Sequence, residues 1–500
     1  MSRRIGILGT SVVAAGLTAV ALGAVACSVA TPNRPHNEAD RGAQLYLRHC
    51  AVCHGASGDA DTRAADLMVP RPNAFRSGLF KLVTTANGMP SETDLVATLR
   101  RGMPGSTMMA YDWLAADELG LLARHVRKLA VQGRAESIQR TASLSGRALD
   151  PAQATAQAEA QLAAGPTVAL GDAVEADAAV LAEGARLFAR HCAACHGEDG
   201  RGLPYAANLP TDGTWLWPRD FTAGYLRGAA DRRSLAARIV AGMPAAHMPP
   251  TALAPAEATA LVAYVQSMIP EEAAMRHVQW RRTLRVARVA QLPADDASWG
   301  AVERVRLPAV PLRWRADASD EVSVGIVHDG RELAVRIEWA DATKDTRFVP
   351  DRPFGDGVAV QWSEEREPPV LAMGTPDRPV NVWRWHAYDP TETAGVTDLL
   401  GAGDAQPAQP QARTESTRFH GFGSIGDALA AGLGITAVAE WRDGRWSVTF
   451  RRPLAARTAE EVGFVVGERR FFALAVWDGH RDTDAGSKTI TTWHALELVP

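Results

Sequence analysis

The sequence has very few lysines. Among its 53 lysine and arginine residues only Lys81, Lys128, Lys344 and Lys488 are lysine, and the formal net charge is −4. This balance gives no basic surface of the kind that nucleic-acid-binding domains carry, so we expect no nucleic-acid partner. Five cysteines in 500 residues are too few for a disulfide-stabilised fold. A mean hydropathy of −0.12 excludes a polytopic membrane protein.

The first residues are typical of an export signal. Arg3 and Arg4 precede an uncharged run, rich in alanine and valine, that ends just before Cys27. We therefore interpret residues 1–27 as an export or lipoprotein signal and expect a periplasmic protein. Three outcomes stay open: a lipid anchor at Cys27, cleavage after a small residue, or an uncleaved anchor, since about 22 apolar residues can just span a bilayer.

The first half of the chain contains an internal repeat. GAQLYLRHCAVCHG at residues 42–55 recurs as GARLFARHCAACHG at residues 184–197. Each copy is followed by a methionine-containing turn, RGMPGSTMMAY at 101–111 and AGMPAAHMPP at 241–250. Apolar residues then recur every three or four positions, which predicts helices over 115–129 and 255–268.

Both copies contain the C-x-x-C-H pattern, which is the attachment motif of covalent haem c. The residues are Cys50, Cys53 and His54 in the first copy and Cys192, Cys195 and His196 in the second. Two cysteines one helical turn apart can add to the two haem vinyl groups, and the adjoining histidine is then held beneath the iron. A zinc site would need two further ligands, and a redox cysteine pair would not require histidine after it in both copies. We therefore predict two covalent c-haems.

A methionine in the following turn is the expected sixth ligand of each iron, because Met/His ligation gives an electron-transfer centre of raised potential. Met108 follows His54 by 54 residues, and Met248 follows His196 by 52 residues. The alternatives are Met103 and Met109 in the first turn and Met243 in the second.

Both segments resemble class I cytochrome c domains over about 90 residues each. We place these two all-α domains at residues 37–132 and 179–270. The intervening residues 133–178 are rich in alanine and glutamine, and we interpret them as a linker with some helical character.

From about residue 289 the helical spacing gives way to alternation of apolar and polar residues. Residues 322–327 and 333–339 alternate around Asp329-Gly330, which is typical of a β-hairpin, and residues 446–450 alternate after Asp443-Gly444. Many short strands joined by such turns predict an antiparallel β-sandwich after the two helical domains.

Residue usage in this region sets two side chains apart. After Met275 the only methionine is Met373, and Lys488 is one of two lysines there, the other being Lys344. A neutral lysine can ligate a metal whereas arginine cannot, because arginine does not lose its proton in proteins. We interpret Lys344 as a surface charge.

Three segments resemble the haem-b gamma subunit of ethylbenzene dehydrogenase and its relatives in dimethylsulfide dehydrogenase, selenate and chlorate reductases and nitrite oxidoreductase. They are PPVLAMGTPDRPVNVWRWHAY (368–388), WRDGRWSVTFRRPL (441–454) and WDGHRDTDAGSKTITTWHALEL (477–498). The resemblance implies a β-sandwich over 288–500 that holds one haem b between Met373 and Lys488. His386 is a rival ligand, because relatives often carry lysine there. The sequence also departs from the family at 395–418, which we expect to be a surface insertion.

The resemblance also implies partners. The family's b-haem subunit exchanges electrons with an iron–sulfur subunit of a molybdenum oxidoreductase, and two cytochrome c domains would extend the route to a cytochrome or a membrane redox partner. The leading hypothesis is therefore an exported, non-catalytic electron-transfer subunit. One alternative is a dihaem cytochrome c whose sandwich is a haem-free docking or ligand-binding module. The other is a dihaem peroxidase, which a methionine in both turns argues against.

Overall fold

The computed structural model describes residues 38–173, 175–203, 217–224, 226–271, 281–312, 321–346, 355–371, 373–387, 414–422, 434–479 and 488–500. The expected signal at 1–27, including Cys27, and most of the expected insertion at 395–418 lie outside these residues. Within the described ranges, no helix combines the length and apolar character that crossing a membrane requires.

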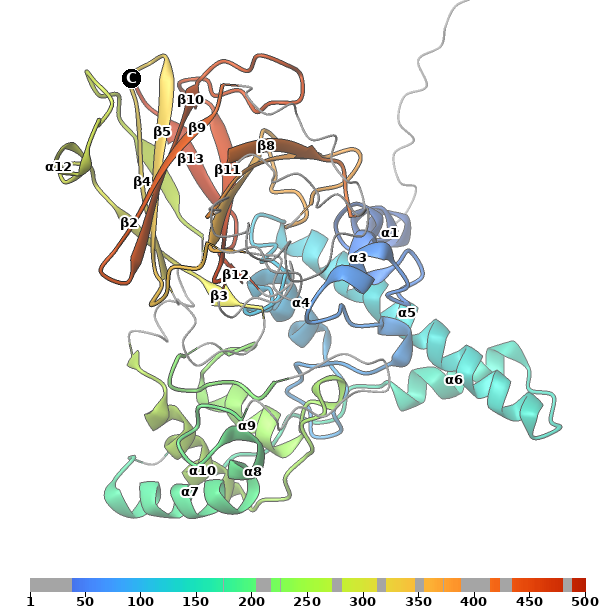
Figure 1. Ribbon diagram of the computed structural model, residues 1–500. Helices are drawn as coiled ribbons and strands as arrows, with labels where there is room; N and C mark the ends of the chain where they lie inside the picture. The colour runs from blue at the N-terminus through green and yellow to red at the C-terminus, as the bar shows by residue number, and fades with distance from the viewer. Residues whose placement is uncertain are drawn as a thin grey trace, which may run out of the picture.

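Helices form the first half of the described chain, and strands form the second (Figure 1). This confirms the predicted order of a helical region followed by a β-rich region. The helices and 3₁₀ turns are α1 (Glu38–His49), α2 (Ala51–His54), α3 (Arg63–Leu67), η1 (Phe75–Ser77), α4 (Glu92–Arg101), α5 (Ala116–Leu144), α6 (Pro151–Gln161), α7 (Ala178–His191), α8 (Ala193–His196), α9 (Arg232–Val240), η2 (Pro244–Ala246), α10 (Pro255–Met268) and α12 (Asp296–Trp299).

In each repeat, the first helix crosses a late helix at a glycine. A Cβ atom on Gly42 of α1 would lie 2.8 Å from the carbonyl oxygen of Leu121 in α5. On Gly184 of α7 it would come closer still to the carbonyl oxygen of Ala260 in α10. Only glycine lets two backbones approach this closely. Because α2 and α8 follow these helices almost directly, the two crossings also fix the C-x-x-C-H segments in space.

The segment between the repeats contains more helix than its composition indicates. Helix α5 runs on to Leu144, well past the predicted end at residue 129, and packs against α6. Small buried side chains at Ala135, Ala154 and Ala158 form this contact. Helix α6 and the C-terminal part of α5 project from the rest of the molecule (Figure 1).

The β-rich region consists of two sheets. One has the order β1-β13-β11-β6-β7-β8, with β12 and β3 attached beside β11, and the other has the order β2-β4-β5-β10-β9. Their strands are β1 (Thr283–Val286), β2 (Val305–Pro308), β3 (Val310–Pro311), β4 (Glu321–His328), β5 (Glu332–Ala340), β6 (Gly357–Ser363), β7 (Val380–His386), β8 (Thr414–Phe419), β9 (Thr436–Arg442), β10 (Arg445–Pro453), β11 (Arg469–Trp477), β12 (Thr489–Ile490) and β13 (His494–Leu498).

The predicted hairpins are present. Strands β4 and β5 pair across Asp329-Gly330, and β9 and β10 pair across Asp443-Gly444. Two details differ from the sequence prediction. Strand β1 pairs with β13 in parallel, because the chain reaches this edge from the helical region rather than through a hairpin. Residues 414–418, expected within a surface insertion, instead belong to β8 and pair with β7.

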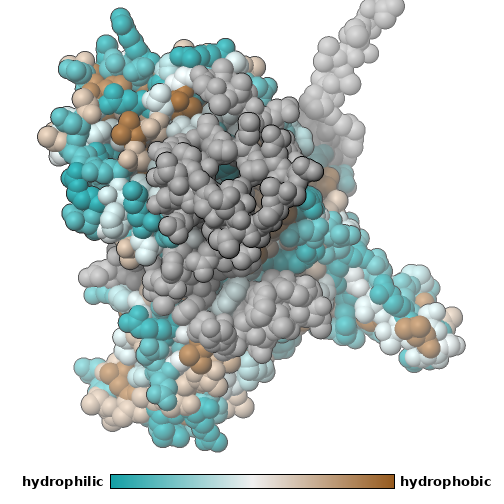
Figure 2. All heavy atoms as spheres, in the orientation of Figure 1, coloured by the Kyte–Doolittle hydropathy of each residue, from teal (hydrophilic) through white to brown (hydrophobic). Residues whose placement is uncertain are grey.

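One hydrophobic core includes residues from both sheets. Its largest fully buried side chains, none more than 2% exposed, are Trp339, Trp362, Trp383, Phe450 and Phe472. Alternation along the strands directs these side chains to the same side of each sheet. In the view of Figure 2, hydrophilic side chains cover most of the described surface and hydrophobic ones are scattered over it.

Strand β11 does not alternate, because both of its faces are buried. Phe472, Leu474 and Val476 point into the core that the two sheets share. Phe471 and Ala473 belong to a second cluster, which they form with residues of the first cytochrome-like region such as Tyr46, Leu99 and Met109. The continuous apolar run of β11 is therefore the sequence signal of a sheet covered on both faces. The first helical region packs directly against this sheet.

Candidate haem sites

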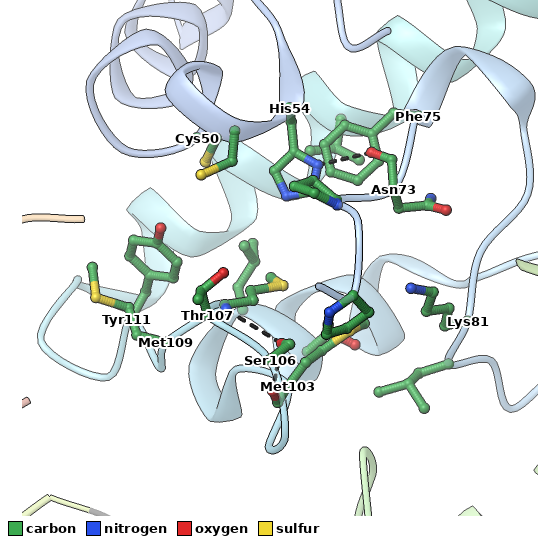
Figure 3. A pocket seen from close by; sticks show the side chains of 18 of the residues that line it. Cys50, His54, Asn73, Phe75, Lys81, Met103, Ser106, Thr107, Met109 and Tyr111 are labelled. Carbon is green, nitrogen blue, oxygen red and sulfur yellow. Dashed lines mark hydrogen bonds between the residues drawn. The ribbon is translucent and has the colours of Figure 1, made fainter. Parts of the chain in front are cut away.

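The first C-x-x-C-H segment lies at the edge of an apolar cavity of about 110 Å³ (Figure 3). His54 extends from α2 into this cavity and faces the turn that contains Met103, Ser106 and Thr107. Three residues from other regions close the cavity: Arg227, Val370 and Leu371.

Two neighbours hold the His54 ring. Its Nδ1 lies 2.8 Å from the carbonyl oxygen of Asn73, and its ring stacks on Phe75 with centroids 4.4 Å apart. Donation from Nδ1–H to the carbonyl leaves the lone pair of Nε2 on the cavity side, which is the tautomer that a metal-ligating histidine needs. Burial lowers the pKa of His54 to about 4, so the ring is neutral at pH 7.

The cysteine thiols favour haem attachment over zinc binding. Burial raises the pKa of both Cys50 and Cys53 to about 12, and that of Cys192 to about 11. Zinc needs three or four protein ligands, and among the described residues neither cysteine pair belongs to a group of three or more side chains that could hold a metal ion.

The first methionine turn brings three candidate ligands to the same cavity. The Met103 N–H donates to the carbonyl oxygen of Met108 at 2.9 Å, and Ser106 Oγ accepts from the Met108 N–H at 3.3 Å. Met109 is only 4% exposed and packs in the cluster against β11, whereas Met108 is half-buried. Met108 also packs against this cluster, so Met108 stays the predicted ligand because of its spacing from His54, which is close to that of Met248 from His196.

The second site repeats this arrangement in a cavity of about 390 Å³. His196 Nδ1 lies 3.4 Å from the carbonyl oxygen of Arg219, and its ring stacks on Phe221 at 4.6 Å. Met243 and Met248 form an antiparallel bridge and both line the cavity. The volume falls in the range of about 300–1,000 Å³ typical of ligand pockets. Donor set, tautomer and apolar walls therefore fit a covalently attached haem at both sites.

The residues that hold the histidines were not identified from the sequence. Asn73 and Phe75 lie in PNAF at 72–75, and Arg219 and Phe221 lie in PRDF at 218–221. The shared signal is P-x-x-F, about twenty residues after each C-x-x-C-H motif. The repeat comparison could have found it, but neither position contains a residue type that binds metals.

The structure places Met373 and Lys488 on two segments of the larger sheet region. Met373 lies in the turn before β7, where its carbonyl oxygen accepts from the Gly421 N–H at 2.9 Å. Lys488 precedes β12, its carbonyl oxygen accepts from the Leu312 N–H at 3.0 Å, and its Nζ lies 5.3 Å from the Trp477 ring centroid. His386 ends β7 opposite Gly357.

These two segments meet the first cytochrome-like region. Leu371, two residues before Met373, and Ile490, two residues after Lys488, line a small cavity. The other wall of that cavity is the first methionine turn, including Met103, Met108 and Met109. Arg378 also donates from Nη2 to the carbonyl oxygen of Arg48 at 2.7 Å, next to the first C-x-x-C-H motif.

A separate cluster of acidic side chains lies at one end of the β region. One carboxylate oxygen from each of Asp341, Asp356 and Asp478 lies within 4.8 Å of the others. Asp356 accepts hydrogen bonds from the Asp345 and Gly479 N–H groups and from Trp446 Nε1. Burial, and then the neighbouring carboxylates, raise the pKa of Asp341, and burial raises that of Asp356.

Three segments of the chain match models of known protein families. Residues 37–126 match the family model of cbb3-type cytochrome c oxidase subunit III, residues 181–268 match that of cytochrome c, and residues 299–489 match that of ethylbenzene dehydrogenase.

Two relatives match part of the chain. A protein named as a respiratory nitrate reductase haem subunit of Haloferax mediterranei is 28% identical over 217 residues, which are 42% of this chain and 69% of that protein. The chlorate reductase gamma subunit of Ideonella dechloratans is 28% identical over 184 residues, 36% of this chain and 66% of that protein.

Among solved structures, a chain of the reducing HAO-like complex of Kuenenia stuttgartiensis matches with a TM-score of 0.38 and 24% identity, over 46% of this chain and 96% of that one. The family matches agree with the repeat and with the change of character near residue 289. The chain therefore combines two segments similar to cytochrome c domains with a segment similar to ethylbenzene dehydrogenase, a combination that supports a role in electron transfer.

Proposed function

We propose that this chain is an exported electron-transfer protein that holds two covalent c-haems and one non-covalent haem b. When bound, each haem iron carries one electron by alternating between its ferric and ferrous states. The proposed attachment residues are Cys50, Cys53, Cys192 and Cys195, and the proposed axial ligands are His54 with Met108, His196 with Met248, and Met373 with Lys488.

The contact between the first methionine turn and the β region carries this proposal. Leu371 and Ile490, which flank the proposed haem-b ligands in sequence, share a cavity with Met108. Arg227 of the second cytochrome domain lines the first haem cavity as well as its own. These shared walls support the order that we propose for the three sites: haem b, first c-haem, second c-haem, with the first cytochrome domain in the middle.

This order assigns a task to each end. The β domain, like the haem-b subunits of its relatives, receives or delivers electrons at an iron–sulfur subunit of a molybdenum oxidoreductase. The second cytochrome domain exchanges electrons with a cytochrome c or a membrane redox partner. The names of the nitrate and chlorate reductase relatives support the first of these assignments.

Separate quantification of b and c haem in the purified full chain tests the proposal. Expression with the haem-c maturation system followed by a pyridine haemochrome spectrum should give two c-haems and one b-haem per chain. Two c-haems without any haem b would reduce the β domain to a docking or ligand-binding module. Hydrogen peroxide turnover by the loaded chain would instead favour a dihaem peroxidase, which the methionine beside each cavity argues against.

A further inference from the structure

Four arginines from both cytochrome domains gather between the two c-haem cavities. Arg227 lines both cavities, and Arg219 and Arg238 line the second. Arg101, the last residue of α4 in the first domain, lies within electrostatic range of Arg238 in the second. Arg219 and Arg227 also lie close enough for their positive charges to repel each other.

This cluster lacks matching negative charge among the described residues. Asp231 is the one described carboxylate that acts electrostatically on Arg101 and Arg238. No described carboxylate offsets the lowered pKa of Arg219 or Arg227, and Asp220, next to Arg219, accepts hydrogen bonds from Thr222 and Ala223 instead. Arg101 Nε, Arg219 Nε and Arg227 Nη1 are buried and have no hydrogen-bond partner in the described part of the chain. Burial lowers the pKa of Arg219 to about 10. Arg238 is 7% exposed and the other three side chains are half-buried, and buried guanidinium nitrogens without a partner are costly unless an anion pairs with them.

The cavities themselves indicate which anion that is. A haem carries two propionate carboxylates, so two haems bring four negative charges to this region. Guanidinium groups pair with carboxylates through two parallel hydrogen bonds, and Arg227 is the cation that both cavities reach. We infer that Arg227, assisted by Arg219, would hold propionate carboxylates of both c-haems and so supply one positive charge shared by the two cavities across the domain boundary.

Arg219 ties this boundary together in a second way. Its carbonyl oxygen accepts from His196, the proposed proximal ligand of the second haem. Its guanidinium Nη2 donates to the carbonyl oxygen of Gly105, in the methionine turn of the first haem, at 3.4 Å. The residue that orients one proximal histidine therefore also contacts the turn that contains the other haem's proposed methionine ligand. Arg219 is thus a positioning residue for both sites.

The inference rests on the proposed function, because it requires a haem in both cavities. It adds that the two centres share one charged group, so their redox potentials are coupled to the same side chain. A cation beside the haem favours the reduced, less positive iron, because its charge repels the extra positive charge of the oxidised form. Removal of the Arg227 charge should lower both c-haem potentials together.

The experiment compares the full-length protein with Arg227→Gln, Arg227→Lys and Arg233→Gln. Arg233 is exposed on α9 and serves as the matched control. A pyridine haemochrome spectrum first counts the c-haems, and a potentiometric titration of their absorption then gives both potentials. We expect Arg227→Gln to retain both c-haems and to lower the reduced-to-oxidised ratio of each about tenfold at fixed potential, which equals about 59 mV for one electron. Arg233→Gln should leave both unchanged.

Each other outcome is informative. If only one c-haem potential shifts, or neither does, in an Arg227→Gln protein that carries both haems, the proposal of a shared site is overturned. Should that variant fail to load both haems, Arg227→Lys carries the test, because lysine keeps the charge but cannot pair with carboxylates bidentately. Loading of both haems with potentials close to the wild type then supports the inference, because the charge that sets both potentials is kept. A shift of one potential alone, or a second failure to load both haems, overturns it. A wild-type chain without two c-haems would instead reject the proposed function, before any variant is measured.

Discussion

The Nδ1 atom of His54 lies 2.8 Å from the carbonyl oxygen of Asn73, and the equivalent pair in the second repeat, His196 and Arg219, lies at 3.4 Å. Each histidine also stacks on the phenylalanine that follows the carbonyl residue by two positions: His54 on Phe75 and His196 on Phe221. A hydrogen bond and a stacked ring together fix the orientation of an imidazole, so its second nitrogen is aimed at the cavity before any metal is bound. The accepting residue can be Asn73 in one repeat and Arg219 in the other, because its backbone carbonyl and not its side chain accepts the hydrogen bond.

Substitution of single methionines distinguishes the candidate ligands of the first haem. We expect Met108→Leu to abolish the methionine–iron charge-transfer absorption of one c-haem and to lower its potential, because leucine offers no sulfur to the iron. Met109→Leu should retain both features, since Met109 is 4% exposed and packs against β11. Near-infrared absorption of the oxidised protein checks this. Loss of the band in Met109→Leu alone would reassign the ligand.

The helix crossings are sensitive to a single added carbon. Gly42→Ala and Gly184→Ala should each lower the free energy of unfolding by about 1–3 kcal/mol, because the new Cβ meets a backbone carbonyl of α5 or α10 that cannot move aside. Gly120→Ala in α5 is the control, since its Cβ would meet only the ends of flexible side chains. Thermal unfolding, monitored by circular dichroism, checks whether Gly42→Ala and Gly184→Ala are less stable than Gly120→Ala. Equal stability of all three variants would contradict it.

The buried carboxyl group of Asp341 makes the stability of the β domain dependent on pH. Burial and the neighbouring acids raise its pKa from 3.8 to about 8. A raised native pKa gives a contribution that is complete below about pH 4 and is lost as the pH rises towards 8, so stability should fall across this window. Asp341→Asn should flatten the dependence and add on the order of 2 kcal/mol at pH 8.

Urea unfolding at several pH values, followed by tryptophan fluorescence, measures this effect. Asp356→Asn is the informative comparison, because Asp356 accepts from three N–H groups and its loss should destabilise the domain at every pH. A pH profile of Asp341→Asn that parallels the wild type would contradict the assignment.

The proposed haem-b ligand Lys488 has a matched control in Lys344, which is exposed. Lys488→Arg should abolish haem-b binding and leave both c-haems in place, because arginine cannot supply a neutral amine to iron. Lys344→Arg should have no effect. The pyridine haemochrome ratio of b to c haem reads out both variants, and an unchanged b-haem signal in Lys488→Arg would remove Lys488 from the site. In that case His386 becomes the next residue to test.

The sequence alone determined the features that depend on nearby residues. The haem-attachment motif occupies five consecutive positions, as in Cys50 to His54, and the covalent chemistry requires this spacing. Hairpins such as β4–β5 follow from alternation and a two-residue turn, and helices such as α10 follow from a period near 3.6. These signals are local, so tertiary contacts seldom override them.

Only the tertiary structure decided how the three regions meet. That Leu371 and Ile490 lie against the turn of Met108, and that Arg227 reaches two cavities, depends on contacts between residues more than one hundred positions apart. No period or motif encodes such pairings, because they arise when complementary apolar faces are buried against each other. These contacts bury both faces of β11 and leave unpartnered arginine nitrogens between the cytochrome domains.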